Sequence, residues 1–365
     1  MLFSTEPKTS LDELFDREAE IERFRSGLNE RLVLVLGIRR VGKSSLVLSV
    51  LNSLGIDYVF IDVRKLYDNV SRKVPAERIY NELRMSLGNL SFWEGGLGGS
   101  LTRLTYPLAP IRFRLSASRI RDGIAKILEA INNAGKHMVL VFDEAQYLRY
   151  STIGLRPLLA YVYDHLRNIT LVLTGSEVGL LHDFLGINDP SSELYGRYYH
   201  VVELRPFDRE RSIEFLRRGG FRELGINVDD RVIERAADEL GGIVGWLVYF
   251  GRLYPERGGV DAINEVKGGI GANLVRSELE ELFSRSQYYR YIMEAVAVLG
   301  RARWSDVMKY LMAKMGERPT NATLSRDLNN LVKMGGFLTK DGDWYGIPDP
   351  IVRYAVLRAR YFTRS

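Results

Sequence analysis

The octapeptide Gly37-Ile38-Arg39-Arg40-Val41-Gly42-Lys43-Ser44 is the stretch from which the fold of this chain can be predicted. It fits the pattern G-x-x-x-x-G-K-[ST], in which backbone N–H groups surround phosphate oxygens, the lysine reaches the β- and γ-phosphates and the hydroxyl holds Mg²⁺. The alternative is a glycine-rich turn with a surface lysine. We therefore expect a nucleotide-binding loop made of Gly37, Arg39, Arg40, Val41, Gly42, Lys43, Ser44 and Ser45.

The residues on both sides of this loop have the patterns that such a site requires. Residues 32–36 are an uninterrupted apolar run, typical of a buried parallel strand. Residues 45–54 have the pattern of a helix, whose N-terminal dipole would favour a bound anion. A strand, a loop and a helix in this order indicate a P-loop nucleotide-binding fold.

The remaining apolar runs predict an α/β fold with a parallel sheet. Four further strands are expected at 58–63, 137–142, 169–173 and 199–204, separated by helices at about 75–86, 120–133 and 155–166. Strands that alternate with helices form parallel sheets with helices on both faces, and ligands bind beyond the carboxyl ends of the strands. Gly37, Asp143, Thr174 and Ser176 all follow such ends, so one site is expected there.

Asp143 and Glu144 directly follow the expected strand 137–142. A strand-end carboxylate beside a triphosphate can hold Mg²⁺, so Asp143 and Ser44 are the predicted metal ligands. Glu144 could polarise the attacking water. The structural alternative is an acidic cap after a buried strand.

Three other residues are candidates with weaker support from the pattern. Thr174 and Ser176 could hydrogen-bond the γ-phosphate or orient water, or they could be ordinary turn residues. Arg197 could stabilise transition-state charge in its own chain or on a neighbouring subunit, although most arginines here are expected on the surface. Arg39 and Arg40 could line the phosphates or face a partner. The predicted catalytic residues are Lys43, Glu144 and Arg197.

The sequence divides into three predicted domains. Residues 1–205 are expected to form the ATPase core, with an irregular glycine-rich insertion at about 88–118. Residues 206–286 contain only helical patterns and are predicted to be a helical lid. Residues 287–365 predict three helices and a hairpin across Asp341-Gly342-Asp343, which is typical of a winged helix.

The excess of basic residues in the last domain suggests DNA as its partner. Residues 285–365 hold 14 Lys/Arg against 7 Asp/Glu, and Arg326 and Lys333 lie on the third expected helix, which would enter a DNA groove. The alternative is a docking or protein-binding domain. For the protein as a whole, a protein partner or a homo-oligomer is left open. Zero cysteines exclude disulfides and thiolate chemistry, and the absence of a signal peptide or an apolar run of about 18 residues predicts a cytoplasmic protein with no membrane partner.

Together the motifs resemble the archaeal ATPase family within the signalling branch of P-loop ATPases, close to AAA+ proteins and origin-recognition ATPases. The resemblance covers about residues 10–360. The residues that carry it are Phe15-Asp16-Arg17-Glu18, the phosphate-binding loop, Val141–Gln146, Leu173–Ser176, Leu194–Arg197, Leu204–Phe207, Asp349-Pro350 and Arg353.

The resemblance implies a five-stranded sheet of order 5-1-4-3-2, ATP or ADP bound with Mg²⁺ between core and lid, and a C-terminal winged helix. It also implies that Phe15 and Arg17 lie near the adenine. Two features depart from the family: Gly242-Ile243-Val244 lacks the usual lid proline, and no lid arginine suggests itself as a second sensor.

The function expected from these features is a Mg²⁺-dependent ATPase that acts as a slow, nucleotide-controlled conformational switch. Two alternatives remain open at this level. One is an ATP-regulated DNA-binding protein that resembles replication initiators; the other is a signalling or defence scaffold that oligomerises with nucleotide.

Overall fold

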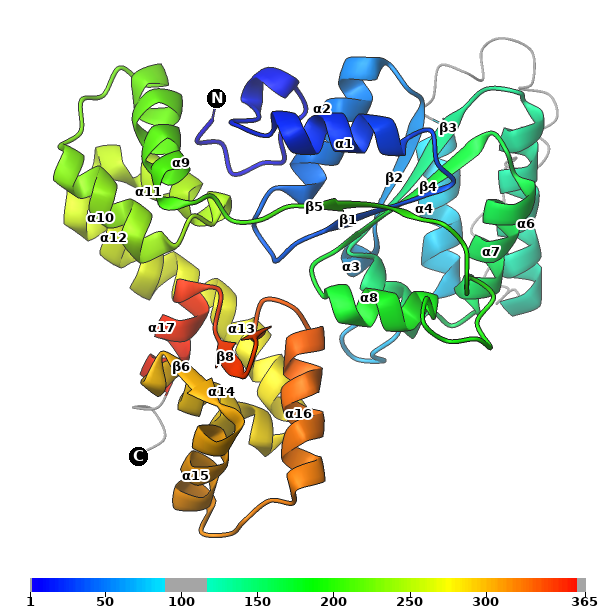
Figure 1. Ribbon diagram of the computed structural model, residues 1–365. Coiled ribbons are helices and arrows are strands. Elements are labelled where there is room, and N and C mark those ends of the chain that lie inside the picture. The colour runs from blue at the N-terminus through cyan, green and yellow to red at the C-terminus, as the bar shows by residue number, and fades with distance from the viewer. Residues whose placement is uncertain (1, 89–116, 360–365) are drawn as a thin grey trace.

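The apolar runs of the sequence form a five-stranded parallel sheet in the computed structural model, which describes residues 2–88 and 117–359 (Figure 1). The strands are β1 (Leu32–Leu36), β2 (Tyr58–Asp62), β3 (Met138–Asp143), β4 (Ile169–Gly175) and β5 (His200–Glu203). Their order is β2-β3-β4-β1-β5 with every pairing parallel, which confirms the expected order 5-1-4-3-2. Every residue of β1, β3 and β4 is buried, because these central strands are covered on both faces.

Alternate side chains of the central strands point to opposite faces of the sheet. Val33 and Val35 of β1 pack with α1 (Glu18–Gly27) and α2 (Lys43–Leu54). Leu34 and Leu36 lie in the other apolar cluster, with the remaining core helices. Those helices are α3 (Val63–Leu66), α4 (Ala76–Gly88), α6 (Ala117–Asn133), α7 (Leu155–His165) and α8 (Val178–Leu185), with a 3₁₀ segment at Ala145–Tyr150.

The predicted insertion at about 88–118 lies almost wholly outside the described residues, because α4 ends at Gly88 and α6 begins at Ala117. Within the described ranges, no helix combines the length and apolar character needed to span a bilayer.

Helices follow the sheet, as the sequence predicts. The lid contains α9 (Arg209–Glu214), a π-helical segment (Phe215–Phe221), α10 (Asp230–Leu240), α11 (Val244–Arg257), α12 (Gly259–Glu265), a second π-helical segment (Val266–Ile270) and α13 (Gly271–Arg285). The C-terminal region contains α14 (Gln287–Leu299), β6 (Arg301–Arg303), α15 (Trp304–Met315), α16 (Asn321–Lys333), β7 (Thr339–Asp341), β8 (Trp344–Gly346) and α17 (Pro350–Ala359). The strands β6, β8 and β7 form a small antiparallel sheet.

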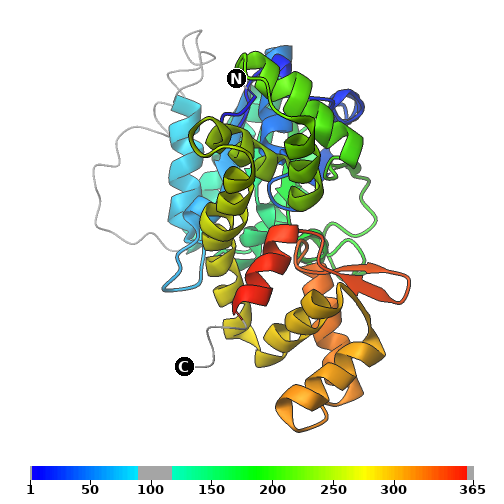
Figure 2. The same ribbon diagram turned by 90° about the vertical axis from the view of Figure 1, so that its left-hand side faces the viewer.

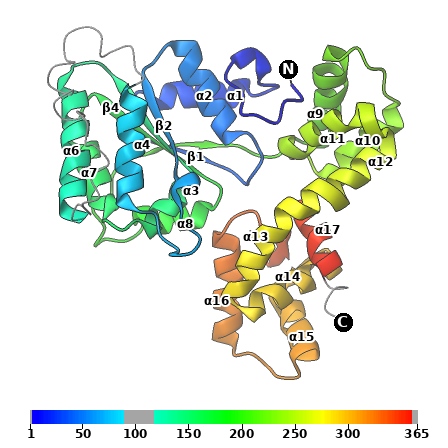
Figure 3. The ribbon, with the colours of Figure 1, turned by 180° about the vertical axis from the view of Figure 1, so that it is seen from behind.

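One apolar cluster joins the lid to the C-terminal region, where the sequence suggested a boundary at 286/287. The cluster runs without a break from Phe207 and Trp246 through Leu282 to Ile292 and Val356. Figure 3 shows α13 running from the lid to the C-terminal elements, and Figure 2 shows those elements as a lobe below the sheet and the lid. A shared core favours movement of these two parts as one body.

The segment before α1 is held by the lid. Phe3 is buried between the lid glycines Gly220 and Gly251, at both of which a Cβ atom would lie within 2.5 Å of the Phe3 ring. The ring also makes edge contacts with Phe215 and Phe221 at centroid distances of 5.8 and 5.1 Å. A few residues later, the backbone N–H of Lys8 donates to Ser45 Oγ at 3.0 Å, so this segment links the lid to the phosphate-binding loop.

We expect Phe3→Ala to lower the free energy of unfolding by about 3–5 kcal/mol, because it removes a buried ring from a tightly packed position. Urea-induced unfolding followed by tryptophan fluorescence would measure this. Val70→Ala is a matched control, since Val70 is 96% exposed. Equal, small losses for the two variants would contradict the buried position of Phe3.

Candidate functional site

The phosphate-binding loop connects β1 to α2 at the carboxyl edge of the sheet. Gly42 has φ +99°, a left-handed conformation that favours glycine, and α2 begins at the next residue, Lys43. Lys43 Nζ donates to the carbonyl oxygens of Gly37 at 2.9 Å and Ile38 at 3.0 Å, and it lies 4.0 Å from Glu144 Oε1. Burial lowers the pKa of Lys43, although the Glu144 and Asp143 charges oppose this shift. The loop thus curls around the lysine that is expected to reach a phosphate.

Ser44 and Asp143 lie together, as expected for a magnesium site. Ser44 Oγ is 3.0 Å from both carboxylate oxygens of Asp143, and Thr174 Oγ1 donates to Asp143 Oδ1 at 2.5 Å. Burial raises the pKa of Asp143, while the hydrogen bonds from Thr174 and Ser44 oppose the rise. Within the described ranges, no three His, Asp or Glu side chains form a metal-binding group. The donor set fits Mg²⁺ bound by one hydroxyl and one carboxylate, with phosphate and water as the other ligands.

Glu144 is held in one orientation beside Lys43. Its Oε2 accepts hydrogen bonds from Ser176 Oγ at 2.6 Å and Gln146 Nε2 at 2.5 Å, and its backbone N–H donates to Thr174 Oγ1. Burial would raise the pKa of Glu144, but Lys43, Arg39 and these hydrogen bonds together lower it to about 2. The carboxylate is therefore ionised, and its Oε1 faces Lys43.

Thr174 and Ser176 donate hydrogen bonds to the two carboxylates. Both are fully buried and do not line the cavity described below; their hydroxyl groups bond Asp143 and Glu144. Gln146 belongs to the same hydrogen-bond network, and motif reasoning did not assign it this role. The sequence suggested a hydrogen bond to the γ-phosphate or orientation of water; in the structure both hydroxyl groups instead bond the carboxylates Asp143 and Glu144.

A cavity of about 1310 Å³ separates the core from the lid. This is larger than the roughly 300–1,000 Å³ typical of small-molecule sites. Of the residues predicted to bind nucleotide or metal, the cavity is lined by Phe15, Arg17, Arg39, Arg40, Val41, Gly42, Lys43, Ser44, Ser45, Asp143 and Glu144. Gly37 does not line the cavity.

One end of the cavity is aromatic. Phe15 makes edge contacts with Phe207 and Phe215 at centroid distances of 6.2 and 5.6 Å, and all three rings line the cavity. Arg17 lies over the Phe207 ring at 4.5 Å and donates to the backbone oxygens of Val41 and Arg205. Apolar rings suit the faces of a base, so this end agrees with the predicted adenine position.

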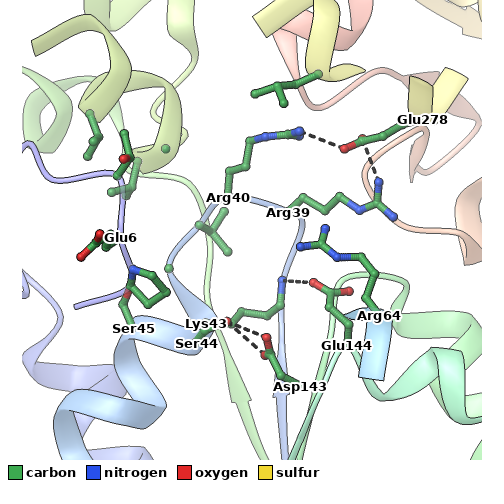
Figure 4. Close-up of a pocket in the computed structure, with 18 of the residues that line it drawn as sticks. Glu6, Arg39, Arg40, Lys43, Ser44, Ser45, Arg64, Asp143, Glu144 and Glu278 are labelled. Atoms are coloured by element: carbon green, nitrogen blue, oxygen red, sulfur yellow. Dashed lines mark hydrogen bonds and ion pairs between the residues drawn. The ribbon is translucent and has the colours of Figure 1, made fainter. Parts of the chain in front are cut away.

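At the other end, a lid carboxylate binds both arginines of the loop (Figure 4). Glu278 of α13 lies 2.8 Å from Arg39 Nη1 and 2.9 Å from Arg40 Nη2. Arg39 is also 3.5 Å from Glu177, which follows β4. The sequence left open whether these arginines face phosphate or a partner; they line the cavity and also contact the lid.

Arg40 begins a chain of contacts to the C-terminal region. Its guanidinium lies 4.4 Å from the ring centroid of Trp246 on α11. The indole N–H of Trp246 is 3.1 Å from both oxygens of Asp349, which also accepts the backbone N–H of Ile351 at 2.8 Å. Burial raises the pKa of Asp349. These contacts give a structural role to Asp349-Pro350, which the sequence marked only through the resemblance.

Arg197 is not brought to the cavity within this chain. It is 40% exposed and pairs with Asp164 through contacts of 2.9 and 3.0 Å. Contact with a nucleotide on a neighbouring subunit stays a prediction. Arg64, Glu278 and Arg285 line the cavity although the sequence interpretation did not select them. Arg64 follows the end of β2, so the strand-end rule could have found it.

Both cations predicted to face DNA have partners inside the chain. Lys333 at the end of α16 lies 2.9 Å from Asp183 of α8, and Arg326 lies 3.1 Å from the buried Asp327. Contact with DNA through Lys333 would require the contact between α16 and the core to open.

The match to a family model covers residues 14–250 and describes an ATPase domain predominantly from Archaea. Among solved structures, the Walker-type ATPase PABY2304 of Pyrococcus abyssi is 37% identical with a TM-score of 0.81, over 98% of this chain and 100% of that chain. The ORC2 protein of Aeropyrum pernix, in ADPNP and ADP complexes, is 15% identical with a TM-score of 0.62, over 99% and 98% of the two chains. Cdc6p of Pyrobaculum aerophilum is 16% identical with a TM-score of 0.52, over 98% and 96%. The last two share the fold; a comparison with curated proteins found no match.

We expect Trp246→Phe to lower the free energy of unfolding by about 1–3 kcal/mol, because the buried Asp349 carboxylate loses a donor while the aromatic packing is largely kept. Chemical denaturation would test this. Trp344→Phe is the control, since Trp344 is 36% exposed. An unchanged transition in Trp246→Phe would contradict the role of this hydrogen bond.

Proposed function

Because this chain belongs to the family of ATPase domains found predominantly in Archaea, we propose that it hydrolyses ATP with Mg²⁺ and acts as a slow conformational switch. ATP would clamp the core to the lid, and hydrolysis would release them. The observation that carries this proposal is the pair Ser44–Asp143 beside the pair Lys43–Glu144, at one end of a cavity between core and lid.

Each residue of the site has a separate role in the proposed hydrolysis of ATP. Lys43 neutralises the phosphate oxygens, and the backbone N–H groups of the loop orient the phosphates. Ser44 and Asp143 would hold Mg²⁺, which when bound would offset the negative charge of the phosphates. Glu144 is ionised and hydrogen-bonded on Oε2, so Oε1 can accept a hydrogen bond from the attacking water and orient it. Positioning and electrostatics supply most of the rate in phosphoryl transfer.

The switch rests on competition between two anions. Glu278 binds the guanidinium groups of Arg39 and Arg40, which also line the nucleotide cavity. A γ-phosphate at Lys43 competes with this carboxylate for Arg39, so ATP and ADP favour different contacts between loop and lid. Because the lid shares its core with the C-terminal region, a change at Glu278 would move both.

Glu144→Gln should bind MgATP with unchanged affinity and hydrolyse it at least 100-fold more slowly, because the amide cannot take up a proton from water. Calorimetry and a single-turnover phosphate assay would measure the two effects. Lys43→Ala is the comparison and should lose nucleotide binding. Hydrolysis by Glu144→Gln at the parent rate would contradict the role of Glu144, and absence of adenine-nucleotide binding by the parent protein would contradict the function.

Glu278→Gln should bind a nonhydrolysable ATP analogue about 5- to 50-fold more tightly, because Arg39 no longer has to leave a carboxylate. Calorimetry in Mg²⁺ would measure this. Glu256→Gln on the lid helix α11 is a matched control, because Glu256 is exposed and does not line the cavity. Weaker analogue binding by Glu278→Gln would indicate that Glu278 positions the arginines for nucleotide and would contradict the competition.

A further inference from the structure

We propose that Arg64 contacts the γ-phosphate from within the same chain and stabilises the charge that develops during hydrolysis. This inference rests on the proposed ATPase function. Arg64 lies in the proposed site but belongs to none of the sequence motifs.

The backbone places Arg64 at the edge of the site. β2 ends at Asp62, which pairs in register with Asp143 of the adjacent strand. The Asp62 carboxylate accepts the backbone N–H groups of Arg64 at 3.0 Å and Lys65 at 3.3 Å and so caps the short helix α3. Arg64 therefore lies in the first turn after β2, beside the turn that carries Glu144, and the cap fixes its backbone.

The side chain is directed into the cavity. Figure 4 shows the Arg64 guanidinium turned toward the space between Arg39 and Lys43, above Glu144. Arg64 lines the same cavity as these residues. Its positive charge adds to burial, the larger cause, in lowering the pKa of Lys43.

Arg64 differs from Arg39, Arg40 and Lys43 in lacking a carboxylate partner. Arg39 pairs with Glu278 and Glu177, Arg40 pairs with Glu278, and Lys43 lies 4.0 Å from Glu144. Across residues 2–88 and 117–359, no carboxylate lies within ion-pair distance of the Arg64 guanidinium. A phosphate oxygen would supply the anion that this fork-shaped group lacks, and a guanidinium binds such oxygens in a two-pronged manner.

The role is electrostatic. In hydrolysis the water oxygen bonds to the γ-phosphorus, the bond to the oxygen bridging the β- and γ-phosphates breaks, and ADP and phosphate leave. The proton lost by the water passes to Glu144 and then to phosphate. Arg64 exchanges no proton; its permanently charged guanidinium offsets the negative charge on the γ-phosphate oxygens.

The test compares Arg64→Gln, Arg64→Lys and the parent protein for MgADP affinity, affinity for a nonhydrolysable MgATP analogue, and single-turnover hydrolysis. Because ADP has no γ-phosphate, Arg64→Gln should bind it within about twofold of the parent. We expect analogue affinity to fall about 10-fold and hydrolysis about 100- to 1,000-fold. Arg64→Lys should recover part of the affinity, and added guanidinium ion should partly restore hydrolysis by Arg64→Ala.

Lys65→Gln is the matched control, because Lys65 is the next residue of α3, is 70% exposed and faces Glu82 at 3.9 Å. It should hydrolyse ATP at the parent rate. Parental hydrolysis by Arg64→Gln, or equal weakening of ADP and analogue binding, would overturn this inference while leaving the ATPase function in place. A parent protein that does not hydrolyse ATP would overturn the proposed function together with it.

Discussion

The structure depends most on the burial of two adjacent carboxylates, Asp143 and Glu144. Each is less than a tenth exposed, and a buried carboxylate is unfavourable unless cations or hydrogen-bond donors surround it. The surrounding elements supply those groups: Lys43 and Ser44 come from the phosphate loop, Thr174 and Ser176 from the end of β4, and Gln146 from the segment after β3. The sequence motifs are thus linked physically, because each supplies a donor or charge to the same pair.

Two routes lead from this site to the C-terminal region. The first passes from Arg40 over Trp246 to Asp349, at the start of α17. The second passes from Arg39 to Glu177, the residue before α8, whose Asp183 then pairs with Lys333 of α16. Both routes start in the phosphate loop, at neighbouring arginines that share Glu278. A rearrangement at this carboxylate would therefore reach two sides of the C-terminal region together.

Local sequence patterns predicted the elements better than their contacts. The strands were predicted because run 32–36 contains only apolar residues and run 137–142 contains one polar residue, His137, at its start. The strand order came from the resemblance, because order depends on contacts between segments that are distant in the sequence. The helix α17 was not predicted, although Asp349 followed by Pro350 is a good helix start. Glu278 carries no motif and is brought to Lys43 only by folding, whereas Arg64 could have been found from its place just after the end of β2. Arg197 was selected for its motif, but Asp164 of α7 lies within reach and pairs with it.

The lid contact also explains how this chain departs from the family pattern. The sequence offered no lid arginine as a second sensor, and at the position where the lid meets the phosphate loop the structure has a glutamate, Glu278. A lid arginine would be attracted to phosphate and would close the lid by making a new contact. A glutamate does the opposite: it already holds the loop arginines and is repelled by an incoming phosphate. On the proposed function, closure around ATP requires this contact to weaken, and Lys43, Arg39 and Arg64 of the core line the cavity where the γ-phosphate would bind. Arg285, at the end of the lid helix α13, also lines the cavity and pairs with Glu281 at 2.6 Å.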